Sequence, residues 1–233
     1  MSVIMQMNER HRVIIPKKSK YLIGVDEAGR GALAGPVAVG AVIWSRTNSR
    51  ELKKALRSYP VGRDSKKLAP KQREFWFERL LVWRAKGWLD FQVALMGEKI
   101  IDQKGINASV RLGINRNLSV LSRRQAIVPS AGRILLDGGL VAPVIWSDQQ
   151  TIIKGDEREL IIALASIVAK VTRDRLMSRL ARIYPDYEFQ RHKGYGTALH
   201  YQALARFGAA PIHRRSYLKN LTDLISWRKI KNG

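Results

Sequence analysis

Residues 21–45 read YLIGVDEAGRGALAGPVAVGAVIWS, and the architecture of the chain can be worked out from this stretch outward. The apolar runs at 21–25 and 37–44 are typical of buried strands, and the glycines and the proline between them are typical of a turn. We therefore expect a strand hairpin with an elaborate tip. Asp26 and Glu27 follow the first strand directly, so two carboxylates stand at a strand end.

Beyond the hairpin, the spacing of apolar residues predicts an alternation of helices and strands. We expect helices at 70–86, 98–122 and 158–183, and further strands at 88–95, 133–137 and 151–154. The last two strands are apolar enough to be parallel and central in a sheet. A hairpin followed by helix-linked strands predicts an α/β fold with a mixed sheet.

The chain is strongly basic, with 42 lysines and arginines against 19 acidic residues and a formal net charge of +23. Such an excess creates a positive field that attracts polyanions, so nucleic acid is the leading partner. A ribosomal or architectural protein that only neutralises phosphate fits the charge equally well. A peripheral membrane protein fits less well, because the basic residues are scattered along the whole chain instead of being gathered on one amphipathic helix.

The sequence contains no cysteine, so any metal must be held by oxygen or imidazole ligands. That composition favours Mg²⁺ or Mn²⁺. No apolar run approaches the roughly 18 residues of a membrane span, and no basic-then-apolar signal segment opens the chain. We expect a cytoplasmic protein that does not contact a membrane, and nothing in the sequence demands more than a monomer.

Four carboxylates follow short apolar strands in a chain that is poor in acidic residues. They are Asp26, Glu27, Asp137 and Asp156. If they converge at one sheet edge, they repel one another unless divalent cations neutralise them. Two such ions about 4 Å apart activate a water and stabilise the leaving 3′ oxygen during phosphodiester hydrolysis. In isolation, however, an Asp-Glu pair is more often a solvated turn.

Two other kinds of site fit the sequence poorly. A zinc hydrolase is disfavoured, because the histidines show no His-Glu-x-x-His spacing and no cysteine accompanies them. A dinucleotide loop is disfavoured, because Gly29, Gly31 and Gly35 do not follow the G-x-G-x-x-G spacing. Asp26 and Glu27 would also repel a pyrophosphate at that position.

Three segments offer contacts to a nucleic-acid backbone. Gly29, Arg30 and Gly31 can bring backbone N–H groups and a guanidinium to a phosphate or ribose. Lys66 can contact a phosphate. Tyr195 is bracketed by glycines and lies beside basic and hydroxyl side chains, a pattern suited to stacking on a sugar or base. Each segment alone reads equally well as a tight turn or a solvated side chain.

These blocks, in their order along the chain, resemble the bacterial ribonuclease HII family, which are type 2 ribonucleases H. The matching segments are Asp26–Gly31 with Gly35–Val37, Asp64–Leu68, Leu135–Gly138, Lys154–Asp156, Ala165–Asp174, His192–Thr197 with His200, and Pro211–Ser216. The resemblance runs from Tyr21 to Tyr217, and chance coincidence of so many ordered blocks is remote.

The resemblance implies a ribonuclease H-like fold, with helices about a five-stranded sheet and a C-terminal helical segment that helps to hold a duplex. It implies cleavage of the RNA strand of RNA/DNA hybrids and incision of DNA duplexes 5′ to embedded ribonucleotides, leaving 3′-hydroxyl and 5′-phosphate ends. By resemblance, the catalytic ligands of the Mg²⁺ or Mn²⁺ ions are Asp26, Glu27, Asp137 and Asp156. The residues expected to recognise the ribonucleotide 2′-hydroxyl are Gly29, Arg30, Gly31 and Tyr195, whereas Asp174 is assigned a structural role.

We divide the chain into an extension at 1–20, a catalytic domain at 21–183, and a segment at 184–233 that combines substrate-binding helices with a basic tail. One block departs from the family pattern, because Ile161–Ser166 is bulkier than the usual Ser-Ala-Ala-Ser, which puts helix packing there in question.

Two alternative functions stay open beside the metal-dependent nuclease. One is a non-catalytic module with the same fold, and the four carboxylates argue against it because they repel phosphate. The other is a type 1 ribonuclease H that needs several consecutive ribonucleotides. Tyr195 and the Gly-Arg-Gly turn argue against it by resemblance.

Overall fold

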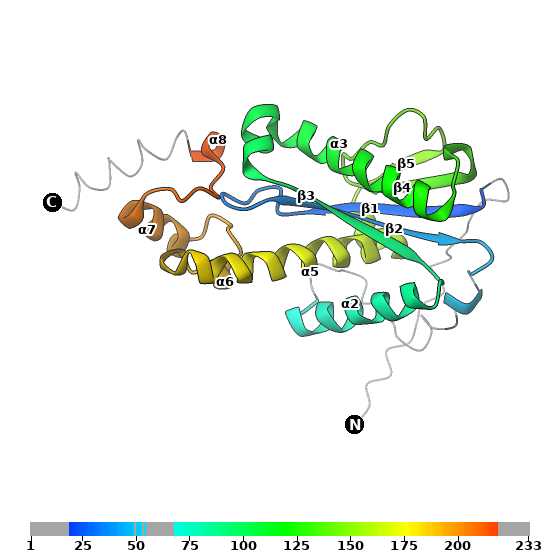
Figure 1. Ribbon diagram of the computed structural model, residues 1–233, viewed down its shortest axis with the longest axis horizontal. Coiled ribbons are helices and arrows are strands. Elements are labelled where there is room, and N and C mark those ends of the chain that lie inside the picture. The colour runs from blue at the N-terminus through cyan, green and yellow to red at the C-terminus, as the bar shows by residue number, and fades with distance from the viewer. Residues whose placement is uncertain (1–18, 49, 53, 55–67, 219–233) are drawn as a thin grey trace, which may run out of the picture.

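The centre of the computed structural model is a five-stranded mixed sheet, and the structure describes residues 19–48, 50–52, 54 and 68–218 (Figure 1). The strands are β1 (Tyr21–Ala28), β2 (Val37–Ser45), β3 (Asp90–Met96), β4 (Gly132–Asp137) and β5 (Gln149–Ile152). Their order in the sheet is β3-β2-β1-β4-β5. β2 is antiparallel to β1 and β3, whereas β4 is parallel to β1 and β5. The predicted hairpin and the mixed α/β sheet are therefore confirmed.

Helices cover both faces of this sheet. The long helices are α2 (Pro70–Ala85), α3 (Glu98–Gln125) and α5 (Leu160–Ile183). α5 and α2 lie on one face and α3 lies on the other (Figure 1). The shorter helices are α4 (Gly155–Arg158), α6 (Phe189–His192), α7 (Ala198–Phe207) and α8 (Arg215–Leu218), with 3₁₀ turns at Pro129–Ala131 and Pro185–Tyr187. No helix in the described part of the chain is long and apolar enough to cross a membrane.

Two sequence-based boundaries are wrong. The strand expected at 151–154 lies at Gln149–Ile152, and it is the edge strand of the sheet instead of a central one. Its side chains are exposed or half-buried. The helix expected from residue 158 is interrupted at Glu159, whose φ of −122° and ψ of 114° are extended. That break separates α4 from α5.

Two glycines allow the backbone of α5 to lie directly on the hairpin. A Cβ at Gly24 in β1 would stand 2.3 Å from the carbonyl oxygen of Ile161, and one at Gly40 in β2 would stand 2.3 Å from that of Ala165. Both distances are far below van der Waals contact, so only glycine fits. The bulky Ile161 and Ile162, whose packing the sequence left in question, are fully buried in the core between α5 and the sheet.

The chain after α5 packs as a small apolar cluster against the tip of the hairpin. Tyr187, Phe189 and Leu204 contribute buried side chains to this cluster, together with Leu33 of the tip. Arg214 N donates a hydrogen bond to Leu33 O at 2.8 Å, which fastens the C-terminal segment to the tip. The proposed extension before residue 19 and the basic tail after residue 218 fall outside the described residues. The division at residue 183 stays a prediction.

We predict that Gly24→Ala and Gly40→Ala each lower the free energy of unfolding by about 1–3 kcal/mol, because each new methyl group pushes α5 away from the sheet. Urea unfolding followed by circular dichroism measures the change. Gly139→Ala is the control, since Gly139 is exposed in a turn, its φ is not positive, and a Cβ there meets nothing within 4 Å. The control should change stability by less than about 0.5 kcal/mol. Unchanged stability in both test variants would contradict the close approach.

Candidate active site

Asp26 is the most deeply buried carboxylate at the end of β1, with 1% of its surface exposed. Its Oδ1 accepts a hydrogen bond of 2.7 Å from the amide of Glu27, whereas its buried Oδ2 has no hydrogen-bond partner. Burial, and then repulsion from Asp137 and Glu27, raise the pKa of Asp26 well above its usual range, and the nearby Ser166 hydroxyl opposes this shift only partly. An orphaned, crowded carboxylate of this kind is the usual mark of a functional site.

Asp137 stands beside Asp26 because of the parallel register of their strands. Val25 pairs with Leu136, so the next residues on the two strands are these two aspartates. Oδ1 of Asp137 accepts a hydrogen bond of 2.7 Å from the amide of Gly155. That bond ties the end of β4 to the start of α4.

The other two expected carboxylates lie in different surroundings. Glu27 is half-buried and forms an ion pair of 3.5 Å with Arg30. Asp156 is buried in the first turn of α4, next to the glycine that binds Asp137. Within the described residues, no three acidic or imidazole side chains come together closely enough to enclose a metal ion. Asp137 and Glu27 are nevertheless near enough to Asp26 for their charges to raise its pKa. Asp156 follows Gly155, whose amide binds Asp137.

The turn after β1, at Gly29–Gly31, exposes part of its backbone. Gly29 has a φ of +85°, which favours glycine, and Gly31 is exposed with open space where a Cβ would lie. The Arg30 side chain is exposed and is hydrogen-bonded to Asn107 of α3, in addition to its pairing with Glu27. The exposed backbone at Gly31 leaves room for a ligand to approach the turn closely.

Tyr195 is held next to that turn, although it is far away in sequence. Its ring is half-buried and lies 5.3 Å from the guanidinium carbon of Arg173 and 5.7 Å from Nζ of Lys170. The carbonyl oxygen of the preceding Gly194 accepts hydrogen bonds from Leu33 N at 2.8 Å and from Ala34 N at 3.2 Å. Lys66, the remaining expected substrate contact, lies outside the described residues.

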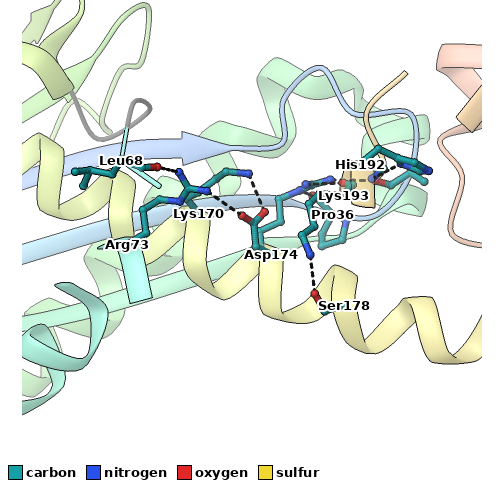
Figure 2. Close-up of polar contacts among 11 residues, drawn as sticks. Pro36, Leu68, Arg73, Lys170, Asp174, Ser178, His192 and Lys193 are labelled. Atoms are coloured by element: carbon teal, nitrogen blue, oxygen red, sulfur yellow. Dashed lines mark hydrogen bonds and ion pairs between the residues drawn. The ribbon is translucent and has the colours of Figure 1, made fainter. Parts of the chain in front are cut away.

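Asp174 behaves as a structural acid. It forms an ion pair of 2.8 Å with Lys170 and one of 3.9 Å with Arg73 of α2, as Figure 2 shows. Arg73 is also hydrogen-bonded to the carbonyl of Leu68, so these contacts link α5, α2 and the segment before α2. They fit the structural role that we predicted for Asp174.

Sequence reasoning missed two fully buried arginines, Arg173 and Arg214, whose side chains donate hydrogen bonds to carbonyls of the turn between β1 and β2. The chain contains 42 lysines and arginines, so the residue type alone does not distinguish these two from the others. A signal was nevertheless present for Arg173, because it continues the buried stripe of α5 four residues after Ala169. No comparable pattern marks Arg214.

Three histidines of the C-terminal segment form a buried structural cluster. His192 stacks on His200 with ring centroids 4.4 Å apart, and Nε2 of His200 lies 2.9 Å from Nε2 of His213. The remaining nitrogens of His200 and His213 contact the carbonyls of Tyr195 and Ala210 at 3.0 and 3.1 Å. Since every ring is occupied by such contacts, the cluster supports the fold around Tyr195 and does not resemble an open metal site. The fourth histidine, His11, lies outside the described residues.

The comparisons with known proteins agree with one family. The family model described as ribonuclease HII matches residues 23–220. A ribonuclease HII of Caldicellulosiruptor saccharolyticus is 40% identical over 202 residues, which cover 87% of this chain and 89% of that protein.

Solved structures share the fold at lower identity. The ribonuclease HII in the PCNA complex of Archaeoglobus fulgidus has a TM-score of 0.61 and 23% identity, covering 84% of this chain and 93% of that one. Bst-RNase HIII in complex with Mn²⁺ has a TM-score of 0.59 and 20% identity, covering 87% of this chain and 66% of that one. The expected ribonuclease H-like fold is therefore confirmed.

We predict that His200 and His213 together lower the free energy of unfolding as the pH falls from about 6.5 towards 4, against the opposite contribution of Asp26. Burial lowers the pKa of His200 and of His213 to about 4, so protons bind the unfolded chain before they bind the folded one. Below the folded pKa this loss is complete. Denaturant unfolding across this range measures how the free energy of unfolding changes with pH. The His200→Gln/His213→Gln double variant keeps every carboxylate but lacks the two imidazoles, so its free energy of unfolding should fall less on acidification. Equal slopes in the two proteins would contradict the prediction.

Proposed function

The chain belongs to the ribonuclease HII family, and from that membership we propose that it hydrolyses the RNA strand of RNA/DNA hybrids and nicks DNA duplexes 5′ to embedded ribonucleotides. The chain is thus a ribonuclease H, a hydrolase, and the proposed products carry 3′-hydroxyl and 5′-phosphate ends. The observation that carries the proposal is the pair Asp26 and Asp137 at the end of adjacent strands, directly beside the turn that begins at Gly29.

The proposed metal ligands are Asp26, Glu27, Asp137 and Asp156. The orphaned Oδ2 of Asp26 and the repulsion among its neighbours fit a divalent cation, because a cation satisfies the buried oxygen and cancels the repulsion. All four donors are hard carboxylate oxygens, which suit Mg²⁺ or Mn²⁺. When bound, two such ions supply an activated water and stabilise the leaving 3′ oxygen.

The chain's own residues would position the scissile phosphate and the sugar. The backbone of Gly29 to Gly31 and the hydroxyl of Tyr195 face the sugar, and Arg30 and Lys66 contact phosphates. Selectivity for ribose follows, because a site built to pair with the 2′-hydroxyl leaves polar groups unpaired when that hydroxyl is missing. The large positive charge of the chain draws the duplex to this surface, and the segment at 184–233 helps to hold it.

We predict that Asp26→Asn abolishes cleavage and, in EDTA, raises the free energy of unfolding by about 1–3 kcal/mol. The raised pKa of Asp26 means that its ionised form opposes folding, an effect that appears as the pH rises above the unfolded pKa near 3.8 and that is present in full above the folded pKa. Thermal unfolding with and without Mg²⁺ or Mn²⁺ tests the ligand role, because wild type should gain stability from the ion and Asp26→Asn should not.

Asp174→Asn is the matched control for that experiment. It also removes one carboxylate, but this carboxylate is paired with Lys170 and Arg73, so the variant should lose stability and keep its response to metal. If Asp26→Asn responds to metal as wild type does, or cuts at a near wild-type rate, Asp26 is not a metal ligand.

We predict that a labelled DNA duplex with one embedded ribonucleotide is nicked on its 5′ side only when Mg²⁺ or Mn²⁺ is present. Tyr195→Ala should lower kcat/KM on this substrate by about 100-fold, because the ring positions the sugar. A long RNA/DNA hybrid offers many registers and should suffer less. Tyr195→Phe keeps the ring and separates stacking from hydrogen bonding.

The outcomes of this assay separate the alternatives. Equal modest losses on both substrates would mean that Tyr195 is only a packed loop residue. Cleavage of the hybrid alone would indicate an enzyme that needs consecutive ribonucleotides, and binding without cleavage of either duplex would indicate a non-catalytic module.

A further inference from the structure

Arg173 and Arg214 are buried cations that form no hydrogen bond or ion pair with a carboxylate of the described residues, although Asp174 acts on Arg173 and Asp102 on Arg214 electrostatically. Both side chains are 0% exposed, and each donates three hydrogen bonds to backbone carbonyls only. Burial lowers the pKa of Arg173, and it lowers the pKa of Arg214 to about 10. An arginine guanidinium nevertheless keeps its proton inside proteins. Burying such charges is costly, which indicates that the six carbonyl contacts serve a purpose.

Five of the six acceptors lie in the segment between β1 and β2. Arg214 binds the carbonyls of Gly29, Arg30 and Gly35 at 2.7, 2.8 and 3.0 Å. It therefore fixes the turn from the side of the C-terminal segment.

Arg173 differs from Arg214 because it binds two separate segments at once. Its Nε and one terminal nitrogen donate to Pro36 O at 2.8 Å and to Ala34 O at 3.1 Å. The other terminal nitrogen donates to Lys193 O at 2.8 Å, and Figure 2 shows Pro36 and Lys193 close together. The same guanidinium carbon lies 5.3 Å from the centre of the Tyr195 ring.

The turn is shaped around this guanidinium. A Cβ at Gly29 would stand 1.9 Å from Nε of Arg173, so the side chain occupies the space that any other residue at position 29 would need. Arg173 therefore contacts Gly29 on one side and the ring of Tyr195 on the other. These are the two elements to which the proposed function assigns recognition of the ribose.

Helix α5 connects this contact to the carboxylates. Ser166, which approaches Asp26, precedes Arg173 by two helical turns, about 10 Å along the axis. Both residues are buried on the helix face that meets the hairpin. One helix thus sets the distance between Asp26, beside Ser166, and the loop at 193–197 that carries Tyr195, beside Arg173.

We propose that Arg173 is a positioning residue that holds the Gly29 turn and Tyr195 in the one arrangement in which both contact the same ribose. The proposal rests on the proposed function. A planar guanidinium can bind three carbonyls in different directions, whereas a lysine ammonium carries its donors on one nitrogen and cannot span both segments. Loss of the fork should therefore reduce selectivity for a single ribonucleotide more than it reduces the chemical step.

The test is Arg173→Lys, with kcat and KM measured on a duplex that holds one ribonucleotide and on a long RNA/DNA hybrid. We expect kcat/KM to fall about 100-fold on the first substrate and by less than about 10-fold on the second, because a small misplacement is enough to spoil alignment. Arg173→Gln is the substitute if the lysine variant does not fold. It removes the buried charge, and its single amide NH₂ group cannot donate to both segments.

Arg175→Lys is the matched control on the same helix. Arg175 is exposed and pairs with Glu74 and Glu78 of α2, so its replacement should leave both substrates unaffected. Equal losses on the two substrates in the Arg173 variants, or none, would overturn the positioning role while the proposed function stands.

Hydrogen exchange measured by mass spectrometry gives a readout that does not need activity. Arg173→Lys should speed exchange of peptides that cover 29–36 and 193–197 by 10-fold or more, with β1 and β4 unchanged. Leu33 and Ala34 report directly, because their amides bind Gly194 O. If wild type cuts neither duplex, the proposed function fails, and this measurement still decides whether Arg173 joins the two segments. Unchanged exchange would overturn the inference.

Discussion

The arrangement of the whole molecule depends on the contact of α5 with β1 and β2 through Gly24 and Gly40. Because neither glycine carries a side chain, the carbonyls of Ile161 and Ala165 lie against the sheet. This fixes the height of the helix above the strands, and rotation is fixed by the buried face that runs from Ile161 to Arg173. Everything that the helix carries, from the hydroxyl beside Asp26 to the guanidinium beneath Tyr195, is thereby placed relative to the end of β1.

The distribution of charge follows the same geometry. A chain with a net charge of +23 draws polyanions from any direction, yet its candidate site is centred on carboxylates. Desolvation and mutual repulsion raise the pKa of Asp26, so the folded protein carries a cost that a bound cation would relieve. In the proposed function, the attraction of phosphate therefore belongs to the basic residues of the whole chain, and the binding of metal belongs to a small buried group of carboxylates. A uniformly basic cleft would bind phosphate as well but would offer metal no ligands.

The sequence predicted what depends on local patterns and failed where contacts between distant segments decide. The continuous apolar runs of β1, β2 and β4 identified the sheet and put Asp26 and Asp137 at strand ends. β5 was misplaced because Ile152 and Ile153 look like a buried pair, although the strand lies at an edge and Ile153 is exposed. The roles of Arg173 and Arg214 could not be predicted, because their acceptors are backbone carbonyls. Every residue has such a carbonyl, so the sequence does not show which ones an arginine binds.

The surface that we propose to recognise the ribose is built from loops, which are the least rigid kind of backbone, and selectivity for a hydroxyl demands rigidity. A loop that could shift would let its donors find other partners when the 2′-hydroxyl is absent, and the penalty for the wrong sugar would vanish. Here the turn is bound by α5, by Gly194 and by the segment at Arg214, and Asp102 of α3 accepts hydrogen bonds of 2.9 Å from the amides of Arg215 and Ser216. Partial burial raises the pKa of Asp102. The hydrogen bonds from these two amides and from the Ser216 hydroxyl lower that pKa by more, so the net shift is downward. The loop is therefore ordered before any substrate arrives, and binding energy is not spent on ordering it.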